Sequence, residues 1–189
     1  DIVESNNGGF YIAASTGSSD GDVTGLIGLR NYWILKCDSS GTILWQKCFG
    51  GTSIDQIRSM TKCFDGGIIA CGSTESLIAG NHGMKDAYII KIDSLGNLEW
   101  EKCFGGSGDD EANSVIQLQD SSYVVAGSSN STDGDIINYR GAQDFWVFKL
   151  SAASTAINEI KSTYSSLKGF VSEQKLTINF NSTTNELLL

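Results

Sequence analysis

The sequence predicts an all-β protein built from about three copies of one unit. The first observation is an internal repeat, because residues 47–51 (Lys-Cys-Phe-Gly-Gly) recur 55 positions later as residues 102–106. The second is that each copy contains short runs of β-forming residues separated by Gly, Asp, Asn and Ser. The third is a content of 22 glycines with no proline, which indicates many tight turns. Four antiparallel strands in a repeat of this length are typical of a β-propeller blade, so we expect a partial β-propeller.

The repeat divides residues 1–150 into blades of about residues 1–51, 52–106 and 107–150. In the second blade we expect strands at residues 56–64, 68–73, 87–92 and 98–104. Asp65-Gly66-Gly67 joins the first two of these strands as a hairpin, because glycine accepts a positive φ angle without strain. The two middle strands are almost continuously apolar, which predicts that each blade is buried on both faces by its neighbours.

A tryptophan marks the fourth strand of the first two blades. Trp45 and Trp100 each follow an Asp-x-x-Gly turn by four residues. This arrangement resembles the tryptophan-docking element of quinoprotein-type propellers, which implies that each indole stacks between neighbouring blades. If so, replacing Trp45 by alanine would cost roughly 3–5 kcal/mol through lost burial and a cavity.

The chain is expected to be a fragment at both ends, because it starts without Met and stops inside an apolar run. Three blades are too few to close a propeller, so blades missing from the N-terminal side are expected to complete it. The third copy has no Trp-bearing strand after Leu150, and we expect a strand from that missing region to fill this place.

The repeat ends at Leu150 and the composition then changes. Residues 151–170 are expected to be a linker, with a short helix suggested by the helical spacing of Ile157, Ile160, Tyr164 and Leu167. Residues 171–189 are expected to begin a β-sandwich-like C-terminal domain, because apolar residues alternate with polar ones up to Phe180.

A wider resemblance covers about residues 1–150. Residues 65–73 (Asp-Gly-Gly-Ile-Ile-Ala-Cys-Gly-Ser), residues 144–149 (Asp-Phe-Trp-Val-Phe-Lys) and the Asp-x-x-Gly-x-x-x-Trp pattern resemble the propeller repeats of large bacterial surface proteins. Many proteins of that kind end in a type IX secretion sorting domain, so the resemblance implies secretion or an outer cell-surface location. It also implies that residues 171–189 open such a sorting domain, although the Tyr-Pro-Asn-Pro motif that usually precedes it is absent.

The charge balance excludes several classes of partner. The formal net charge of −9 leaves no basic patch that could displace counterions from nucleic acid or from an anionic membrane. No apolar run approaches the roughly 20 residues that a membrane-spanning helix needs, so membrane insertion is not expected. The expected partner is a surface protein or a glycan that the sequence does not identify.

Acidic loops are the strongest candidates for a metal site. Asp20-Gly21-Asp22 recurs as Asp133-Gly134-Asp135, in both copies between the second and third strands. Two carboxylates in a glycine-containing loop can supply hard oxygen ligands to Ca²⁺. A solvated turn is the alternative, and the stronger one, because Asp and Gly favour turns for backbone reasons.

Other candidate chemistry is weaker. Residues 109–111 (Asp-Asp-Glu) precede the innermost strand of the third blade and could pair as acid and base for glycoside cleavage, or form a solvated loop. His82 is the only histidine and is expected to be a surface loop residue. Three of the five cysteines (Cys37, Cys63 and Cys71) align with apolar residues in other copies, which favours buried thiols over metal ligands.

The function expected from these features is a non-catalytic secreted or cell-surface module for adhesion or for protein or carbohydrate binding. No catalytic residue is assigned, and Ca²⁺ is the one cofactor considered. Two alternatives stay open: a secreted enzyme domain, either a polysaccharide lyase or hydrolase or a quinoprotein-like propeller, and a structural spacer.

Overall fold

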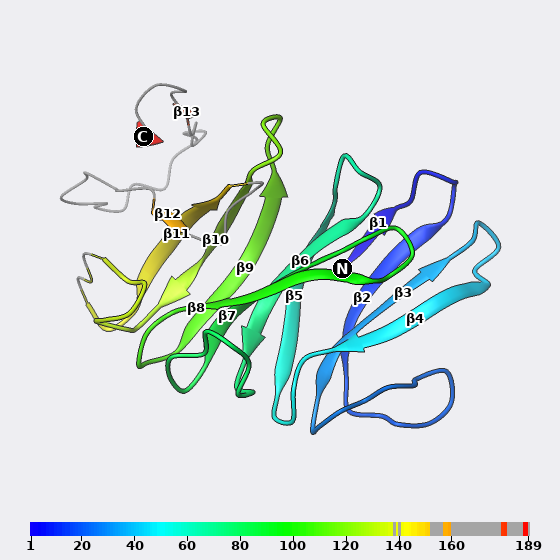
Figure 1. The fold of residues 1–189 in the computed structure, drawn as a ribbon, viewed down its shortest axis with the longest axis horizontal. Coiled ribbons are helices and arrows are strands. Elements are labelled where there is room, and N and C mark those ends of the chain that lie inside the picture. The colour runs from blue at the N-terminus through cyan, green and yellow to red at the C-terminus, as the bar shows by residue number, and fades with distance from the viewer. Residues whose placement is uncertain (138, 140, 152–156, 160–178, 181–186, 189) are drawn as a thin grey trace, which may run out of the picture.

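The computed structural model describes residues 1–137, 139, 141–151, 157–159, 179–180 and 187–188. All regular elements in this part of the chain are β-strands. They form three four-stranded antiparallel sheets, each in the order of the sequence, and one two-stranded pair (Figure 1). The all-β prediction and the four-stranded unit are therefore confirmed.

Sheet one corresponds to the first repeat. Its strands are β1 (Ile2–Glu4), β2 (Phe10–Thr16), β3 (Asn31–Cys37) and β4 (Ile43–Phe49). Sheet two contains β5 (Asp55–Lys62), β6 (Ile68–Thr74), β7 (Asp86–Ile92) and β8 (Leu98–Phe104). Sheet three contains β9 (Asp110–Gln117), β10 (Tyr123–Ser129), β11 (Asp144–Leu150) and β12 (Ile157–Glu159). A separate pair consists of β13 (Asn179–Phe180) and β14 (Leu187–Leu188).

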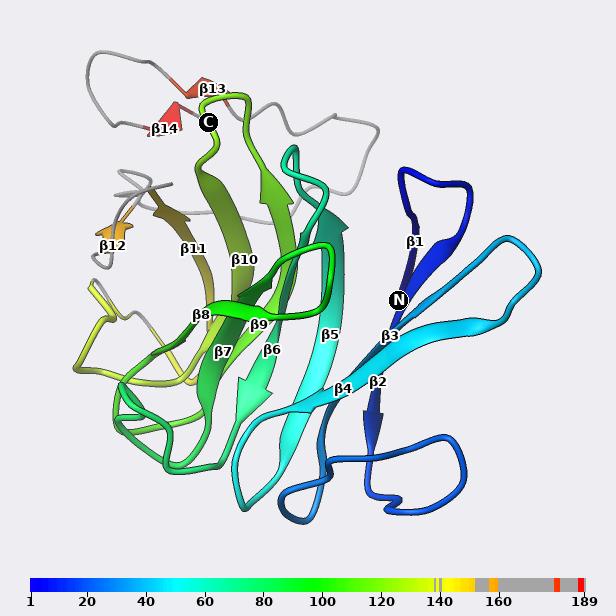
Figure 2. The same ribbon diagram turned by 45° about the vertical axis from the view of Figure 1, so that its right-hand side comes forward.

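The three sheets stack face to face like neighbouring blades (Figures 1 and 2). The first strand of each sheet makes the main contacts with the preceding sheet: β5 packs against β1, β2 and β3, and β9 packs against β5, β6 and β7. Parallel bridges from Arg30 to Ile54 and from Lys85 to Asp109 tie the start of each third strand to the next sheet. Sheet two is thus enclosed from both sides.

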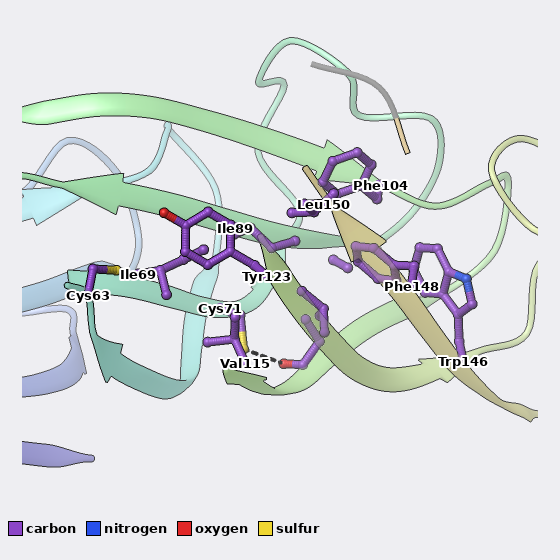
Figure 3. Packing of buried hydrophobic residues seen from close by; sticks show 13 residues of the cluster. Cys63, Ile69, Cys71, Ile89, Phe104, Val115, Tyr123, Trp146, Phe148 and Leu150 are labelled. Carbon is purple, nitrogen blue, oxygen red and sulfur yellow. Dashed lines mark hydrogen bonds between the residues drawn. The ribbon is translucent and has the colours of Figure 1, made fainter. Parts of the chain in front are cut away.

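Burial follows from this stacking. Every residue of β6 and β7 is buried, as their continuous apolar sequence predicted. In β11 of sheet three, burial alternates instead, so that Trp146, Phe148 and Leu150 face sheet two while Phe145 is 75% exposed on the opposite face. Figure 3 shows the apolar cluster between sheets two and three, in which Phe104 packs against Phe148 with ring centroids 5.2 Å apart.

The hairpins are closed by aspartates. Asp93 Oδ1 accepts hydrogen bonds from the backbone N–H groups of Leu95 and Asn97, each 2.8 Å long, and Asp38 closes the equivalent turn of sheet one in the same way. The pKa of Asp38 is lowered by the Ser40 hydroxyl and then by the backbone N–H groups of its turn, and that of Asp93 by the backbone N–H and the side-chain amide of Asn97, because hydrogen bonds to a carboxylate favour its charged form. Gly96 follows at φ 80°, a conformation that other residues adopt only with strain.

Trp45 lies between two sheets. Its ring is 5.9 Å from the Tyr11 ring of its own sheet, and its atoms approach to 3.0 Å from the position that a Cβ on Gly96 would take. Gly96 belongs to the β7–β8 hairpin of sheet two, so the indole rests on the turn of the next blade. Trp100 makes an edge contact with Tyr123 of sheet three, with centroids 6.0 Å apart. Both tryptophans therefore pack across a sheet boundary.

Two expectations about the end of the repeat were wrong. The fourth strand of sheet three is β12, supplied by the chain itself, and it pairs antiparallel with β11 through Ile157 and Leu150. Ile157 is therefore in a strand rather than in the expected helix. The physical reason is that β11 offers an edge whose backbone groups need partners, and a short following segment satisfies them. Ile160, Tyr164 and Leu167 lie outside the described residues.

Candidate functional site

The aspartates considered as calcium ligands lie in the loops between the second and third strands. Asp20 and Asp22 are exposed, and Asp20 Oδ1 accepts a hydrogen bond from the Ser18 hydroxyl. Asp133 Oδ1 accepts a 2.7 Å bond from the N–H of Ser107. That bond lowers the pKa of Asp133. The carboxylates of Asp20 and Asp133 therefore accept hydrogen bonds from the protein itself.

Asp135 has a similar role, since its Oδ2 accepts a 3.1 Å bond from the N–H of Gly105. Asp133 and Asp135 therefore hold the β8–β9 loop in place. Within the described residues, no group of three or more His, Cys, Asp or Glu side chains is arranged to hold a metal ion. Calcium binding stays a prediction.

Residues 109–111 do not form a pair of free carboxylates. Asp110 is fully buried. Glu111 forms ion pairs with Lys85, at 2.5 Å, and with Arg58, at 3.6 Å. A general acid and base must both reach the substrate, but Asp110 is buried and Glu111 is held by two cations, which leaves half-buried Asp109 without a second free carboxyl beside it in this segment. This geometry does not favour the glycosidase alternative.

The cysteines are free thiols. Cys63, Cys71 and Cys103 are buried, as is Cys37, while Cys48 is half-buried. Burial raises the pKa of Cys63 to about 11 and that of Cys71 to about 12. Figure 3 shows Cys71 Sγ directed at the Ala112 carbonyl, which it reaches at 3.7 Å. Such thiols are poor nucleophiles at neutral pH and behave as small apolar side chains.

The boundary between sheets one and two contains a buried amide–carboxylate pair, which we call seam one (Asn31 and Asp55). Both side chains are fully buried. Asp55 Oδ2 accepts bonds from Asn31 Nδ2 (3.0 Å), from Gly51 N (2.9 Å) and from the Ser76 hydroxyl (3.1 Å). The Thr74 hydroxyl donates to Asp55 Oδ1. With four donors, this buried charge is well compensated.

The boundary between sheets two and three contains the equivalent pair, seam two (Asp86 and Asp110), and here both members are acidic. Both are fully buried. Asp110 Oδ2 accepts from Gly106 N at 2.8 Å and from the Ser131 hydroxyl at 2.7 Å. Asp86 Oδ2 accepts from the N–H of His82 at 2.6 Å and lies 3.4 Å from His82 Nδ1. Within the described residues, no hydrogen-bond partner reaches Asp86 Oδ1 or Asp110 Oδ1.

Seam two differs from seam one in its electrostatics, because it places two acidic groups together. Burial raises the pKa of Asp86, and the negative charge of Asp110 raises it further, while the hydrogen bond and charge of His82 act in the opposite direction. His82 was expected to be a plain surface residue; its side chain is 42% exposed, but Nδ1 also approaches Asp135 Oδ2 at 4.0 Å.

Both seams explain the recurring Phe-Gly-Gly sequence. A Cβ on Gly50 would lie 2.1 Å from Asp55 Oδ2, and a Cβ on Gly105 would lie 2.5 Å from Asp110 Oδ2. No side chain fits at these positions, so the carboxylate of the next sheet requires a glycine there. The pairing of Asp86 with Asp110 was not predicted from the sequence. The sequence does contain a sign of it, because the repeat position that holds an amide in the first copy (Asn31) holds an acid in the second (Asp86).

The loops that join second to third strands lie at one end of the sheets (Figures 1 and 2). They expose large apolar side chains, with Leu29 69%, Leu77 96% and Met84 71% exposed. Large apolar side chains that neighbour one another on a surface can form a binding site, and these loops are candidates for one.

Comparison with models of known protein families gives no match, and no curated protein matches the sequence. Among the described residues, no helix has the length and hydrophobicity needed to cross a membrane.

Proposed function

We propose that the chain is a non-catalytic repeat module that binds a surface protein or a glycan through the loops joining the second and third strands. The observation that carries this proposal is the exposure of large apolar side chains on these loops, with Leu77 96% exposed. The loops themselves share one end of the stacked sheets (Figure 1). Aspartates on the same loops, among them Asp20 and Asp22, add acceptors for polar groups of a partner. Mixed apolar and polar character suits recognition of protein or carbohydrate.

The burial and ion pairing of two acidic side chains favour binding over catalysis. Asp110 is buried and Glu111 is paired with Lys85 and Arg58, so these carboxyl groups support the sheets rather than face a substrate. The buried thiols are likewise part of the core.

The test is a binding screen of the full chain against arrays of surface proteins and glycans. The loop variant carries Leu29→Ser and Leu77→Ser. The matched control carries Phe64→Ser and Leu95→Ser, because these large apolar side chains are also mostly exposed (66% and 69%) but lie in the hairpins at the ends of other strand pairs. Loss of binding in the loop variant alone supports the proposal. Equal loss in both variants, or no ligand in either array, contradicts it, and the second result favours a structural spacer.

We further propose that additional blades cover the outer faces of sheets one and three. Phe145 is 75% exposed on the outer face of β11, whereas Ala87, at the equivalent position of the enclosed sheet two, is fully buried. Phe10 is 38% exposed on the outer face of sheet one. Further blades would bury both rings, and a longer chain should then show protection of Phe145 from solvent-based footprinting, which the present chain should lack.

The resemblance to bacterial surface proteins supports a secreted or outer cell-surface location, and it supports a type IX secretion sorting domain beginning within residues 171–189. Cell fractionation of the tagged protein, with and without residues 171–189, tests both ideas. Retention of the truncated protein inside the cell is the expected result.

A further inference from the structure

The two seams place different chemical groups at equivalent positions. Ile27 N donates a 2.8 Å bond to Asn31 Oδ1, and His82 N donates a 2.6 Å bond to Asp86 Oδ2. In both cases the donor is four residues before the acceptor. Asp86 Oδ2 therefore takes the place of the amide oxygen of Asn31. The other carboxyl oxygen, Asp86 Oδ1, takes the place of the amide nitrogen, Asn31 Nδ2.

A second measure gives the same match. Asn31 Nδ2 lies 2.7 Å from the position that a Cβ on Gly50 would take, and Asp86 Oδ1 lies 2.9 Å from the corresponding position on Gly105. In seam one, the atom at this place donates a hydrogen bond to the aspartate of the next sheet. In seam two, the atom at this place is an acidic oxygen facing another acidic side chain, and it can donate only if it carries a proton.

Asp110 also has fewer donors than its counterpart. Asp55 receives bonds from Asn31 and Thr74 in addition to those from Gly51 and Ser76. Among the described residues, Asp110 receives only bonds of the last two kinds, from Gly106 and Ser131. Two adjacent, fully buried carboxylates cannot both remain ionised without a large electrostatic cost, and the usual outcome is that the two share one proton.

We propose that Asp86 carries a proton in the folded protein and donates it to the Asp110 carboxylate, so that seam two is an acid–carboxylate copy of the Asn31–Asp55 pair. The proton takes the place of one amide hydrogen of Asn31. Loss of this proton leaves two negative charges between sheets two and three and weakens the contact between them.

Other charged groups face the pair. His82 approaches Asp86 from the loop before β7, and Asp135 approaches His82 from the loop after β10. Burial raises the pKa of Cys103 on β8, and the nearby Asp86 charge raises it further. Lys85 is engaged with Glu111. The imidazole is thus the one group among these that can favour deprotonation of Asp86, because its charge lowers the pKa of that carboxyl, and the experiment must remove its contribution.

The sign of the pH effect follows from the raised pKa of Asp86. The unfolded chain releases this proton at about pH 4, whereas the folded protein holds it to a higher pH. The stabilisation is therefore complete below about pH 4 and is lost as the pH rises to the folded-state pKa. Over that interval the unfolding equilibrium constant should rise by up to about tenfold per pH unit.

The test compares the full chain with Asp86→Asn by urea unfolding between about pH 4 and pH 8, both in the original protein and in a His82→Gln background. The variant should equal the original near pH 4 and exceed it in stability at higher pH, because Asn donates at every pH. The converse variant, Asn31→Asp, should introduce the same pH dependence into seam one. Isotope-edited infrared spectroscopy should show a protonated carboxyl band in the original protein that Asp86→Asn removes.

Three results would overturn the proposal. One is a difference in the free energy of unfolding between Asp86→Asn and the original protein that does not change with pH in either background. Another is absence of the protonated carboxyl band. The third is stabilisation of the original protein, but not of Asp86→Asn, by calcium or sodium chloride at matched ionic strength, which would mean that a cation rather than a proton joins the two carboxylates.

Discussion

The contact between Trp45 and the hairpin of the next sheet can be measured by adding one methyl group. Gly96 has φ 80°, and a Cβ there would lie 3.0–3.1 Å from three atoms of the Trp45 ring. Gly41 closes the equivalent hairpin of sheet one at φ 86°, and a Cβ on it would meet nothing within 4 Å. The two glycines therefore share the backbone strain that alanine would introduce and differ in the steric contact with the indole.

Gly41→Ala should destabilise the protein by about 1–2 kcal/mol, which is the cost of placing an L-residue in the left-handed region. Gly96→Ala should cost this amount and roughly 1–3 kcal/mol more, because the methyl group overpacks the boundary between sheets one and two. The lower part of that range is expected, since Trp45 is half-buried and can move by a few tenths of an ångström.

Urea unfolding followed by circular dichroism measures both values, and Trp45→Ala completes a double-mutant cycle. In the Trp45→Ala background, Gly96→Ala should cost no more than Gly41→Ala. If Gly96→Ala and Gly41→Ala are equally destabilising in the original protein, the indole does not rest on the hairpin and the reasoning about its packing fails.

Three further predictions concern a strained turn, the thiols and the acidic loops. Ser121 has φ 62° at the position that Gly66 occupies in sheet two, so Ser121→Gly should stabilise the protein by about 1 kcal/mol in urea unfolding, and unchanged or lower stability would contradict this strain argument. Native-state labelling with a thiol reagent should modify half-buried Cys48 well before buried Cys71, whose pKa is about 12, and equal labelling rates would contradict the burial order. If the acidic loops bind Ca²⁺, calorimetric titration should show a signal that Asp20→Asn with Asp22→Asn reduces. A titration without heat at millimolar Ca²⁺ would refute that prediction.

Most of the strand positions could be predicted because the repeat supplies three views of each element. The expected strand at 98–104 has the same bounds as β8 (Leu98–Phe104), and the strand expected at 87–92 differs from β7 (Asp86–Ile92) by one residue. The residue left out of the expected strand is Asp86. Aspartate has a low β-strand propensity, so it is placed outside a strand when only local sequence is considered. Its burial comes from the neighbouring sheet, which no local pattern contains.

The misassigned segment after Leu150 has a different cause. Ile157 and Ile160 are three residues apart, and such a short stretch of apolar residues fits a helix and a strand equally well. The unpaired edge of β11 decides between them, because its backbone groups must find partners. Pairing of β12 with β11 through Phe148 and Leu150 supplies these partners. The deciding interaction is tertiary and lies outside the segment itself.

The polar residues at the sheet boundaries occupy equivalent positions in the copies, and the same positions would be present in a blade that follows sheet three. Asn31, Asp86 and Asp144 occupy the same position at the start of the third strand, while Asp55 and Asp110 occupy the start of the first strand in the following sheet. The first glycine of the Gly-Gly pair before each of these aspartates is required because the carboxylate fills the space of a side chain. A blade that follows sheet three and carries Gly-Gly with an aspartate four residues after the second glycine would therefore bring a carboxylate to Asp144. That boundary should then show the pH dependence expected for seam two, whereas asparagine in place of Asp144 should abolish it. The position of the amide-to-acid exchange thus determines which blade boundaries respond to pH, independently of the apolar packing that all boundaries share.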